Sequence, residues 1–206
     1  SRVAAITSTF TQGNLTHVEN PFSVALEGDG FFQIRTESGE LQYTRDGSFE
    51  ISPVANGNML CTSDGNPVLD AYGNQIILPS NRVATDLVVN QDGTLAFPDG
   101  TGNPAVITDA NGRPVKFGIY QFNNPAGLSK EGSNNYSVTV ASGAAVGGDG
   151  NAAVKQTKTH QYYTEASNVD VANEMVNLIV AQRAYEMNSK AIQASDEMMQ
   201  QANALR

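Results

Sequence analysis

The sequence predicts a mainly β protein that ends in one long α-helix: antiparallel β structure followed by a helix of the coiled-coil type. The first observation is the placement of the residues that interrupt regular structure. All 19 glycines and all 8 prolines of the 206-residue chain precede residue 151. Because glycine and proline mark turns and break helices, turns should fill the first part of the chain. A helix can run without interruption through the last part.

The second observation is a series of tight-turn dipeptides. Asp-Gly and Asn-Gly favour hairpin turns because Asp, Asn and Gly tolerate positive φ angles. Asp-Gly occurs at residues 29–30, 46–47, 64–65, 92–93, 99–100 and 149–150, and Asn-Gly at 56–57 and 111–112. Short β-prone runs lie between them, at residues 31–34, 41–43, 49–51, 76–78, 87–89 and 117–122. Many short strands with no helical segments between them indicate an antiparallel β domain.

These signals divide the chain into four parts. Residues 1–27 have few turn signals and are expected to form an extended arm that leads into the β region. Residues 28–150 should form the antiparallel β domain or domains, and residues 151–169 a connecting segment. The C-terminal helix is assigned to residues 170–206.

The predicted helix has a clear start and one apolar stripe. Asp170 is a good N-cap with Glu174 in the first turn, and helix-forming residues continue to about Leu205. An apolar residue recurs every seven positions, which keeps the series on one face and suits packing against another helix. A companion column, a second seven-residue series, begins four positions later at Met175. The apolar series and Met175, together called the seam, form the candidate assembly interface: Val171, Met175, Leu178, Tyr185, Ile192 and Met199.

The seam needs a partner. Its companion column continues with polar residues such as Gln182 and Ser189, which suits a bundle of several helices better than a two-stranded zipper. A long amphipathic helix must bury its apolar stripe, yet the rest of the chain offers no second long helix. We therefore expect the partner to be another segment of the protein or another copy of it.

The composition argues against two classes of partner. With 21 acidic and 12 basic side chains the net charge is −9, whereas nucleic-acid binding requires clustered Lys and Arg. The longest apolar stretches, residues 75–78 and 175–181, are far shorter than the roughly 20 residues that a membrane span requires. We expect no nucleic-acid partner and no membrane insertion.

The reactive side chains form no recognisable catalytic set. His17 and His160 lie in unrelated sequence contexts, and Cys61, the single cysteine, has no nearby basic residue that would lower its pKa. Asp92 and Asp99 could be imagined as a glycosidase pair, but each precedes a glycine, so a turn explains them without chemistry. The protein is therefore expected not to be an enzyme.

Metal and cofactor sites also find little support. Residues 90–93 imitate the middle of a calcium-binding EF-hand loop, but the first ligand position would be Val88 and the last Asp99 instead of a bidentate Glu. Residues 147–150 are rich in glycine but follow no strand-to-helix junction, so they are expected to be a linker. We expect no metal and no cofactor.

Two stretches of the chain resemble the bacterial flagellar rod and hook family. The first comprises residues 10–15, 20–32 and 43–49, and the second comprises residues 165–169, 174–176 and 181–190. The combination, in this order, is specific to the family, and its distal-rod members are the nearest. Residues 52–160 carry no part of the resemblance.

The resemblance implies a structural role. Family members have N- and C-terminal helices that form an inner coiled-coil layer of a hollow helical tube, with β-rich domains outside it. The resemblance thus implies a distal-rod subunit of the basal body, which is exported through the flagellar secretion apparatus into the periplasm. Its polymer would transmit torque, and the channel of that polymer would carry exported subunits. The implied partners are copies of the chain, neighbouring rod and hook proteins and the surrounding ring proteins. The family's N-terminal helix would precede Ser1 and would be the expected partner of the seam.

Two alternatives remain beside this interpretation. Within the family, the chain could be a hook or proximal-rod subunit. From another class, the polar, turn-rich β region would suit a secreted adhesin or carbohydrate-binding module, although such a module would not need a long helix with a seam.

Overall fold

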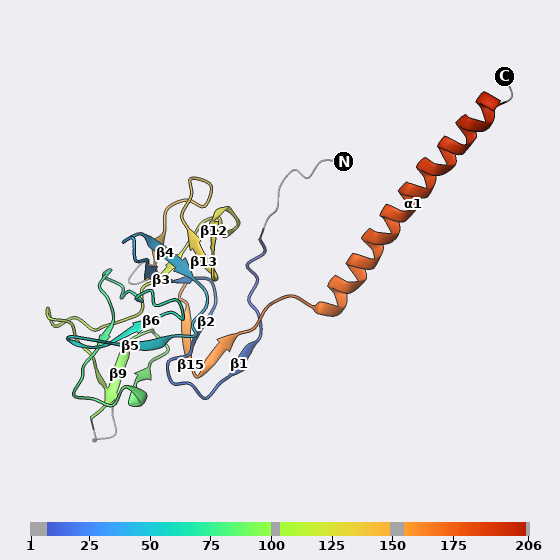
Figure 1. Cartoon of the computed structure of the whole chain (residues 1–206). Coiled ribbons are helices and arrows are strands. Elements are labelled where there is room, and N and C mark those ends of the chain that lie inside the picture. The colour runs from blue at the N-terminus through green and yellow to red at the C-terminus, as the bar shows by residue number, and fades with distance from the viewer. Residues whose placement is uncertain (1–7, 100–103, 149–154, 205–206) are drawn as a thin grey trace. The chain divides into compact units, whose positions relative to one another are not determined.

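The computed structural model describes residues 8–99, 104–148 and 155–204, which belong to two compact units, Ser1–Ser167 and Asn168–Arg206 (Figure 1). The described residues of the first unit, here called the β body, form short antiparallel strands. The second unit contains one α-helix, α1 (Val171–Ala204). The predicted fold class, mainly antiparallel β with a long C-terminal helix, is confirmed.

The elements of the β body are short. In chain order they are β1 (Leu15–His17), β2 (Val24–Glu27), β3 (Phe31–Arg35), β4 (Leu41–Thr44), β5 (Glu50–Val54), β6 (Gly57–Cys61), β7 (Ile77–Leu78), β8 (Val88–Val89), β9 (Leu95–Pro98), β10 (Pro104–Val106), β11 (Ile119–Gln121), β12 (Ser129–Gly132), β13 (Asn135–Ser137), β14 (Val146–Gly147), β15 (Lys158–Gln161) and β16 (Tyr163–Glu165), with 3-10 helices at Ala84–Asp86 and Pro125–Gly127. The largest sheet has the order β12-β13-β4-β3-β11-β14, and smaller sheets have the orders β5-β6-β7 and β10-β9-β8. Two ribbons, β15-β2 and β1-β16, join the ends of the β body.

The central strand β3 separates two hydrophobic clusters. Successive side chains of a strand point to opposite faces, so Phe32 enters the larger cluster and Phe31 the smaller one. In the larger cluster the Phe32 ring lies 5.0 Å from that of Phe49 and 5.3 Å from that of Phe117, measured between centroids. In the smaller cluster Phe31 packs edge-on against Phe10 of the N-terminal arm. The β body therefore has its own aromatic core.

Five turns of the β body share one geometry. In each turn, the backbone amide of the first residue donates to the carbonyl of the fifth residue. The fourth residue is a glycine, and its amide donates to the carbonyl of the first residue. The first residues are Thr36, Thr62, Asp70, Asn90 and Asp109, and the glycines are Gly39, Gly65, Gly73, Gly93 and Gly112. The glycines have φ between +76° and +87°, as a type I turn followed by a G1 bulge requires. Three predicted turn dipeptides, at residues 64–65, 92–93 and 111–112, lie at these turns.

The other predicted dipeptides have different outcomes. Asn56-Gly57 connects β5 to β6 as a hairpin. Gly47 is needed for close approach, because a Cβ there would lie 1.7 Å from the carbonyl oxygen of Val24. The dipeptides at 99–100 and 149–150 lie wholly or partly outside the described residues.

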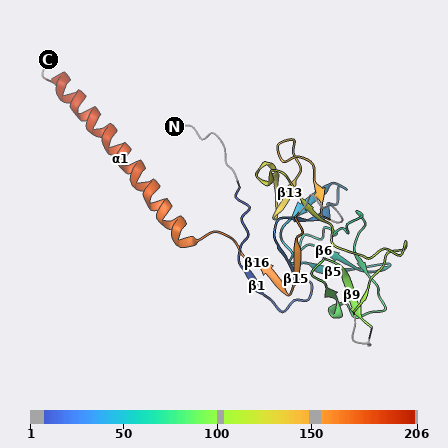
Figure 2. The ribbon, with the colours of Figure 1, turned by 180° about the vertical axis from the view of Figure 1, so that it is seen from behind.

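The structure has strands beyond both boundaries of the predicted β domain, residues 28–150. The range expected to be an arm contains β1 and β2, and the range expected to connect to the helix contains β15 and β16. β2 pairs with β15 and β1 with β16, and Figure 2 shows β1, β15 and β16 close together. Each pair joins segments more than a hundred residues apart, so no local sequence pattern predicts the pairing.

Candidate assembly surface

The start of α1 follows from its first residues. The carboxylate of Asp170 accepts a hydrogen bond from the amide of Ala172 at 2.9 Å and one from the side-chain amide of Asn173 at 2.7 Å. A carboxylate at this position satisfies an orphan N–H group and complements the positive end of the helix dipole. The predicted N-cap at Asp170 is therefore confirmed.

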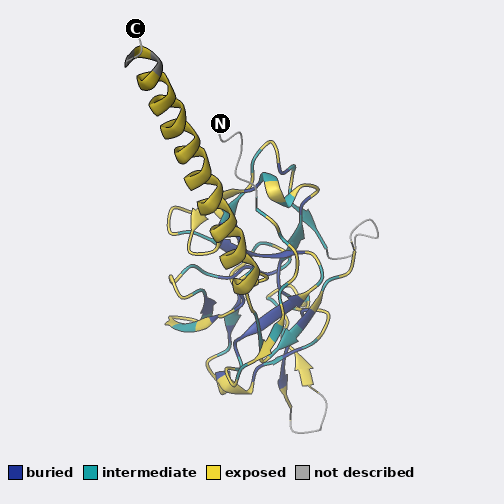
Figure 3. Cartoon of the chain, turned by 90° about the vertical axis from the view of Figure 1, so that its right-hand side faces the viewer, coloured by how far each residue is buried: buried dark blue, intermediate teal, exposed yellow. Residues whose placement is uncertain are grey.

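The predicted seam lies on the surface of the single chain. Its six residues are between 59% exposed, at Leu178, and 78% exposed, at Tyr185. Figure 3 shows α1 coloured as exposed along its length, in contrast to the buried strands of the β body. Within its own unit the helix therefore leaves its described apolar side chains uncovered.

A second apolar stripe on α1 was not anticipated from the sequence. Val176, Met187 and Met198 recur every eleven residues, a spacing close to three full turns, and Val180 lies beside them. All four are more than half exposed. At 3.6 residues per turn Val176 lies about 160° around the helix from Leu178. The eleven-residue repeat is the sequence signal of this stripe, and a seven-residue pattern does not include it.

Mainly polar side chains separate the two stripes. On one side lie Arg183, Glu186, Lys190 and Glu197, together with the apolar Ile179, and on the other Asn177, Asn188 and Ser195. Glu174 and Asp196 lie on the seam side, because each is eighteen residues, or five turns, from a seam residue. This pattern allows α1 to bury two opposite stripes while the basic side chains between them stay in water.

The two stretches of family resemblance meet in the β body. The guanidinium Nε of Arg45 donates to Oε2 of Glu165 at 2.7 Å. Leu15 pairs with Glu165 in the antiparallel β1-β16 ribbon. The arm before β1 and the chain that leads to α1 therefore leave the ribbon at the same end.

The two histidines, unrelated in sequence, lie near one another. The rings of His17 and His160 each pack edge-on against Tyr163, at centroid distances of 5.3 and 6.1 Å. Nε2 of His160 lies 2.6 Å from Oε2 of Glu27. Cys61 is buried in β6, away from the β1-β16 ribbon, and burial raises the pKa of its thiol. A raised pKa keeps the thiol protonated and unreactive.

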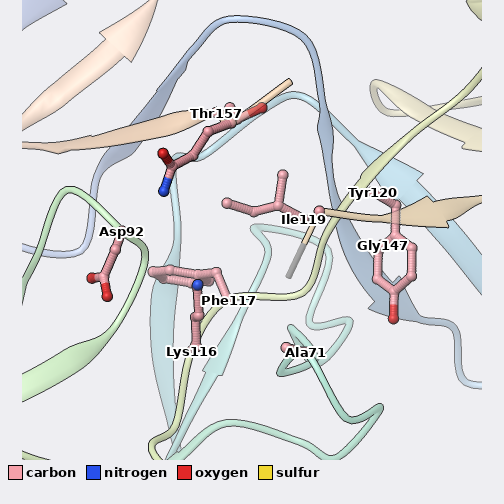
Figure 4. Close-up of a pocket in the computed structure, with 10 residues that line it drawn as sticks. Ala71, Asp92, Lys116, Phe117, Ile119, Tyr120, Gly147 and Thr157 are labelled. Carbon is pink, nitrogen blue, oxygen red and sulfur yellow. The ribbon is translucent and has the colours of Figure 1, made fainter. Parts of the chain in front are cut away.

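A cavity of about 160 Å³ lies beside β11 (Figure 4). Figure 4 shows Phe117 and Ile119 in the middle of its lining, with Asp92 on one side and Tyr120 on the other. Burial raises the pKa of Tyr120. Burial also opposes ionisation of Asp92, but hydrogen bonds from Thr94 outweigh it and lower the pKa of that carboxyl. Neither group is poised to exchange a proton near neutral pH.

The EF-hand-like stretch is one of the five shared turns. The carboxylate of Asp92 accepts hydrogen bonds from the amide and the hydroxyl of Thr94. Within the described residues, no group of three or more His, Cys, Asp or Glu side chains could hold a metal ion. Gly147, expected in a linker, belongs to β14, whereas residues 149 and 150 lie outside the described range. No described helix combines the length and the apolar character needed to span a membrane.

Comparison with known proteins identifies both ends of the chain. Residues 25–97 match the family described as "Flagellar hook protein FlgE/F/G D1 domain", and residues 160–205 match "Flagellar basal body rod FlgEFG protein C-terminal". The chain is 38% identical to the flagellar basal-body rod protein FlgG of Borreliella burgdorferi, covering 100% of this chain and 72% of that protein. It is 36% identical to the FlgG of Caulobacter vibrioides, covering 95% and 68%.

A relative with another name is also similar. The flagellar hook-basal body complex protein FlhP of Bacillus subtilis is 33% identical, over 95% of this chain and 69% of that protein. The domain matches and the FlgG relatives agree with the order of the two stretches noted in the sequence. The chain therefore belongs to the FlgG family of flagellar basal-body rod proteins, as a structural subunit of the bacterial flagellar basal body.

Proposed function

We propose that this subunit polymerises into a hollow axial tube through α1, with both apolar stripes of the helix buried against neighbouring helices. The observation that carries the proposal is the exposure of every α1 side chain that the structure describes, two apolar stripes included. Most of the stability of a protein helix comes from packing of its apolar face, so an isolated α1 is incomplete. Helices of neighbouring subunits supply the missing surface.

The presence of two different stripes favours growth into a filament. The seam and the stripe of Val176, Met187 and Met198 are not equivalent, so one copy would present its seam to a different surface of the next. Contacts of this head-to-tail kind do not pair off within a dimer, and they build open helical assemblies when the rotation does not close.

The remaining roles follow from this architecture. The β bodies would lie outside the helical layer, and the tube would transmit torque while its channel allows export of other subunits. Its partners would be copies of itself, neighbouring rod and hook proteins and the surrounding ring proteins. We propose a distal-rod position, which the FlgG relatives support, and no catalytic role, which the resting ionisation states of Cys61, Asp92 and Tyr120 support.

The test replaces two seam residues with charged ones. Leu178→Asp combined with Ile192→Asp would bury two unpaired carboxylates at every subunit contact, at roughly 3–5 kcal/mol for each buried unpaired charge. Cells carrying only this variant should form no rods and should not swim, while the purified full-length variant keeps the near-ultraviolet circular dichroism spectrum of the wild-type chain.

Two controls accompany the seam variant. Lys190→Asp with Gln201→Asp places acidic residues on the charged face, and this variant should still swim. His17→Ala with His160→Ala should also leave motility intact, because neither ring is assigned a chemical role. Normal rods in the seam variant would contradict assembly through this face.

A further inference from the structure

The β1-β16 ladder ends at Leu15 and Glu165, its last paired position, and this end is here called the fork. The amide of Ala166 donates to the carbonyl of Asn14 at 2.8 Å just beyond it. Hydrogen bonds of an antiparallel ribbon run perpendicular to its strands. A force that pulls the two strands apart from this end would therefore open the ladder one pair at a time, starting at the fork.

Arg45 occupies this fork from outside the ribbon. Its Nε donates to Oε2 of Glu165 at 2.7 Å, while Nη1 donates to the carbonyl of Gly30 at 2.9 Å and Nη2 to that of Gly28 at 2.8 Å. The other carboxylate oxygen of Glu165 accepts a hydrogen bond from the amide of Gly13 at 2.8 Å. One ion pair thus joins both strand exits to the turn between β2 and β3.

Gln12 adds a second connection on the arm. Its side-chain nitrogen donates to the carbonyl of Leu26 at 3.0 Å, and its side-chain oxygen accepts from the amide of Gly28 at 3.0 Å. Gly28 is therefore held from both sides, by Gln12 through its amide and by Arg45 through its carbonyl. Its φ of +108° is one that L side chains rarely adopt.

We propose that Arg45 and Glu165 are positioning residues that hold the fork closed, so that force entering through either chain end is passed to the β body before it can open the ribbon. The two side chains are only 19% and 12% exposed, so salt screens their interaction weakly. Charge-assisted hydrogen bonds are also about twice as strong as neutral ones. This charge-assisted contact thus lies at the last pair of the ladder.

Arginine is required at this position by geometry. Three acceptors on two segments surround its planar fork of donors, and each receives a separate N–H group. A lysine would keep the charge but present one ammonium group on a flexible stem, which cannot reach all three acceptors. Arg45→Lys is therefore expected to behave much like a removal of the contact.

The test measures amide hydrogen exchange by NMR in the full chain, for wild type, Arg45→Met and Arg45→Lys. Both variants should accelerate exchange at the amides of Gly13 and Ala166 by about tenfold or more, because local opening no longer has to break the charge-assisted contacts. The amides of Gln33 and Leu69, which lie in the core of the β body, should exchange at the wild-type rate.

A matched control is available in the same domain. Arg113 forms an ion pair with Asp109 at 2.8 Å across one of the five shared turns, so Arg113→Met removes another Arg–carboxylate pair, which lies outside the ribbon. It should leave Gly13 and Ala166 unchanged. Unaltered exchange at the fork in Arg45→Met would overturn the proposal, and so would equal acceleration at Gln33 and Leu69, since that would indicate a general loss of stability. Hydrogen exchange at the fork depends on the β body alone, so its outcome does not depend on whether the subunit polymerises through α1.

Discussion

The β body and α1 satisfy their apolar side chains in opposite ways. The β body buries two hydrophobic clusters within its own fold, whereas α1 exposes every side chain that the structure describes in that helix. The β body therefore has a core within its own fold, whereas α1, in the proposed assembly, depends on surfaces that other helices provide. A subunit built this way can fold its body first and leave its helix free to assemble.

The largest effect is expected in the core of the β body. Phe117 is 1% exposed and packs against Phe32 and Phe49, so Phe117→Ala should lower the free energy of unfolding by about 3–5 kcal/mol. Urea denaturation followed by the near-ultraviolet tyrosine signal measures this loss. Tyr185→Ala on α1 is the matched truncation and should change the same transition little, because Tyr185 is exposed. Similar losses in both variants would refute the contrast between the two regions.

A smaller effect is expected at the start of α1. Asp170→Ala removes the capping carboxylate and should cost the helix about 0.5–2 kcal/mol, whereas Asp170→Asn keeps a capping oxygen and should cost less. Hydrogen exchange at the amide of Glu174, which donates to the carbonyl of Asp170, reports the fraying. The β-body transition in urea should stay where it is in both variants; a shift there would mean that the cap also supports the body.

The smallest effect is a pH dependence on the surface of the β body. The hydrogen bond from His160 holds the pKa of Glu27 below its ordinary value of 4.5, with the charge of Lys158 contributing. A lowered carboxyl pKa gives stability that is present above the unfolded value and is lost as pH falls through the folded value, so the window lies below pH 4.5. The Glu27 side chain is 52% exposed, which keeps the change small.

An NMR titration of the Glu27 carboxyl carbon tests this expectation. The midpoint should lie below 4.5 in the wild type and should rise toward it in His160→Ala. A wild-type midpoint at or above 4.5 would show that the contact between His160 and Glu27 does not favour the carboxylate in solution.

Local chemistry made the turns and the helix start predictable. A glycine following Asp or Asn can take the positive φ of a G1 bulge, and Asp before a run without Gly or Pro caps a helix, so residues 64–65, 92–93, 111–112 and Asp170 were located from sequence. The seven-residue repeat likewise located one face of α1. The other face was not predicted because it repeats every eleven residues, a period that a heptad pattern does not contain.

Local residue preferences set where this chain turns and where its helix begins, because φ preferences and capping act over a few residues. The pairing of the strands depends on the tertiary fold. β1 meets β16, and Arg45 meets Glu165 across 120 residues. Gln161 donates to the carbonyls of Pro21 and Leu87 and accepts from the amide of Val89. Such contacts depend on which unpaired backbone groups the folded body leaves open, and no neighbouring residue encodes that.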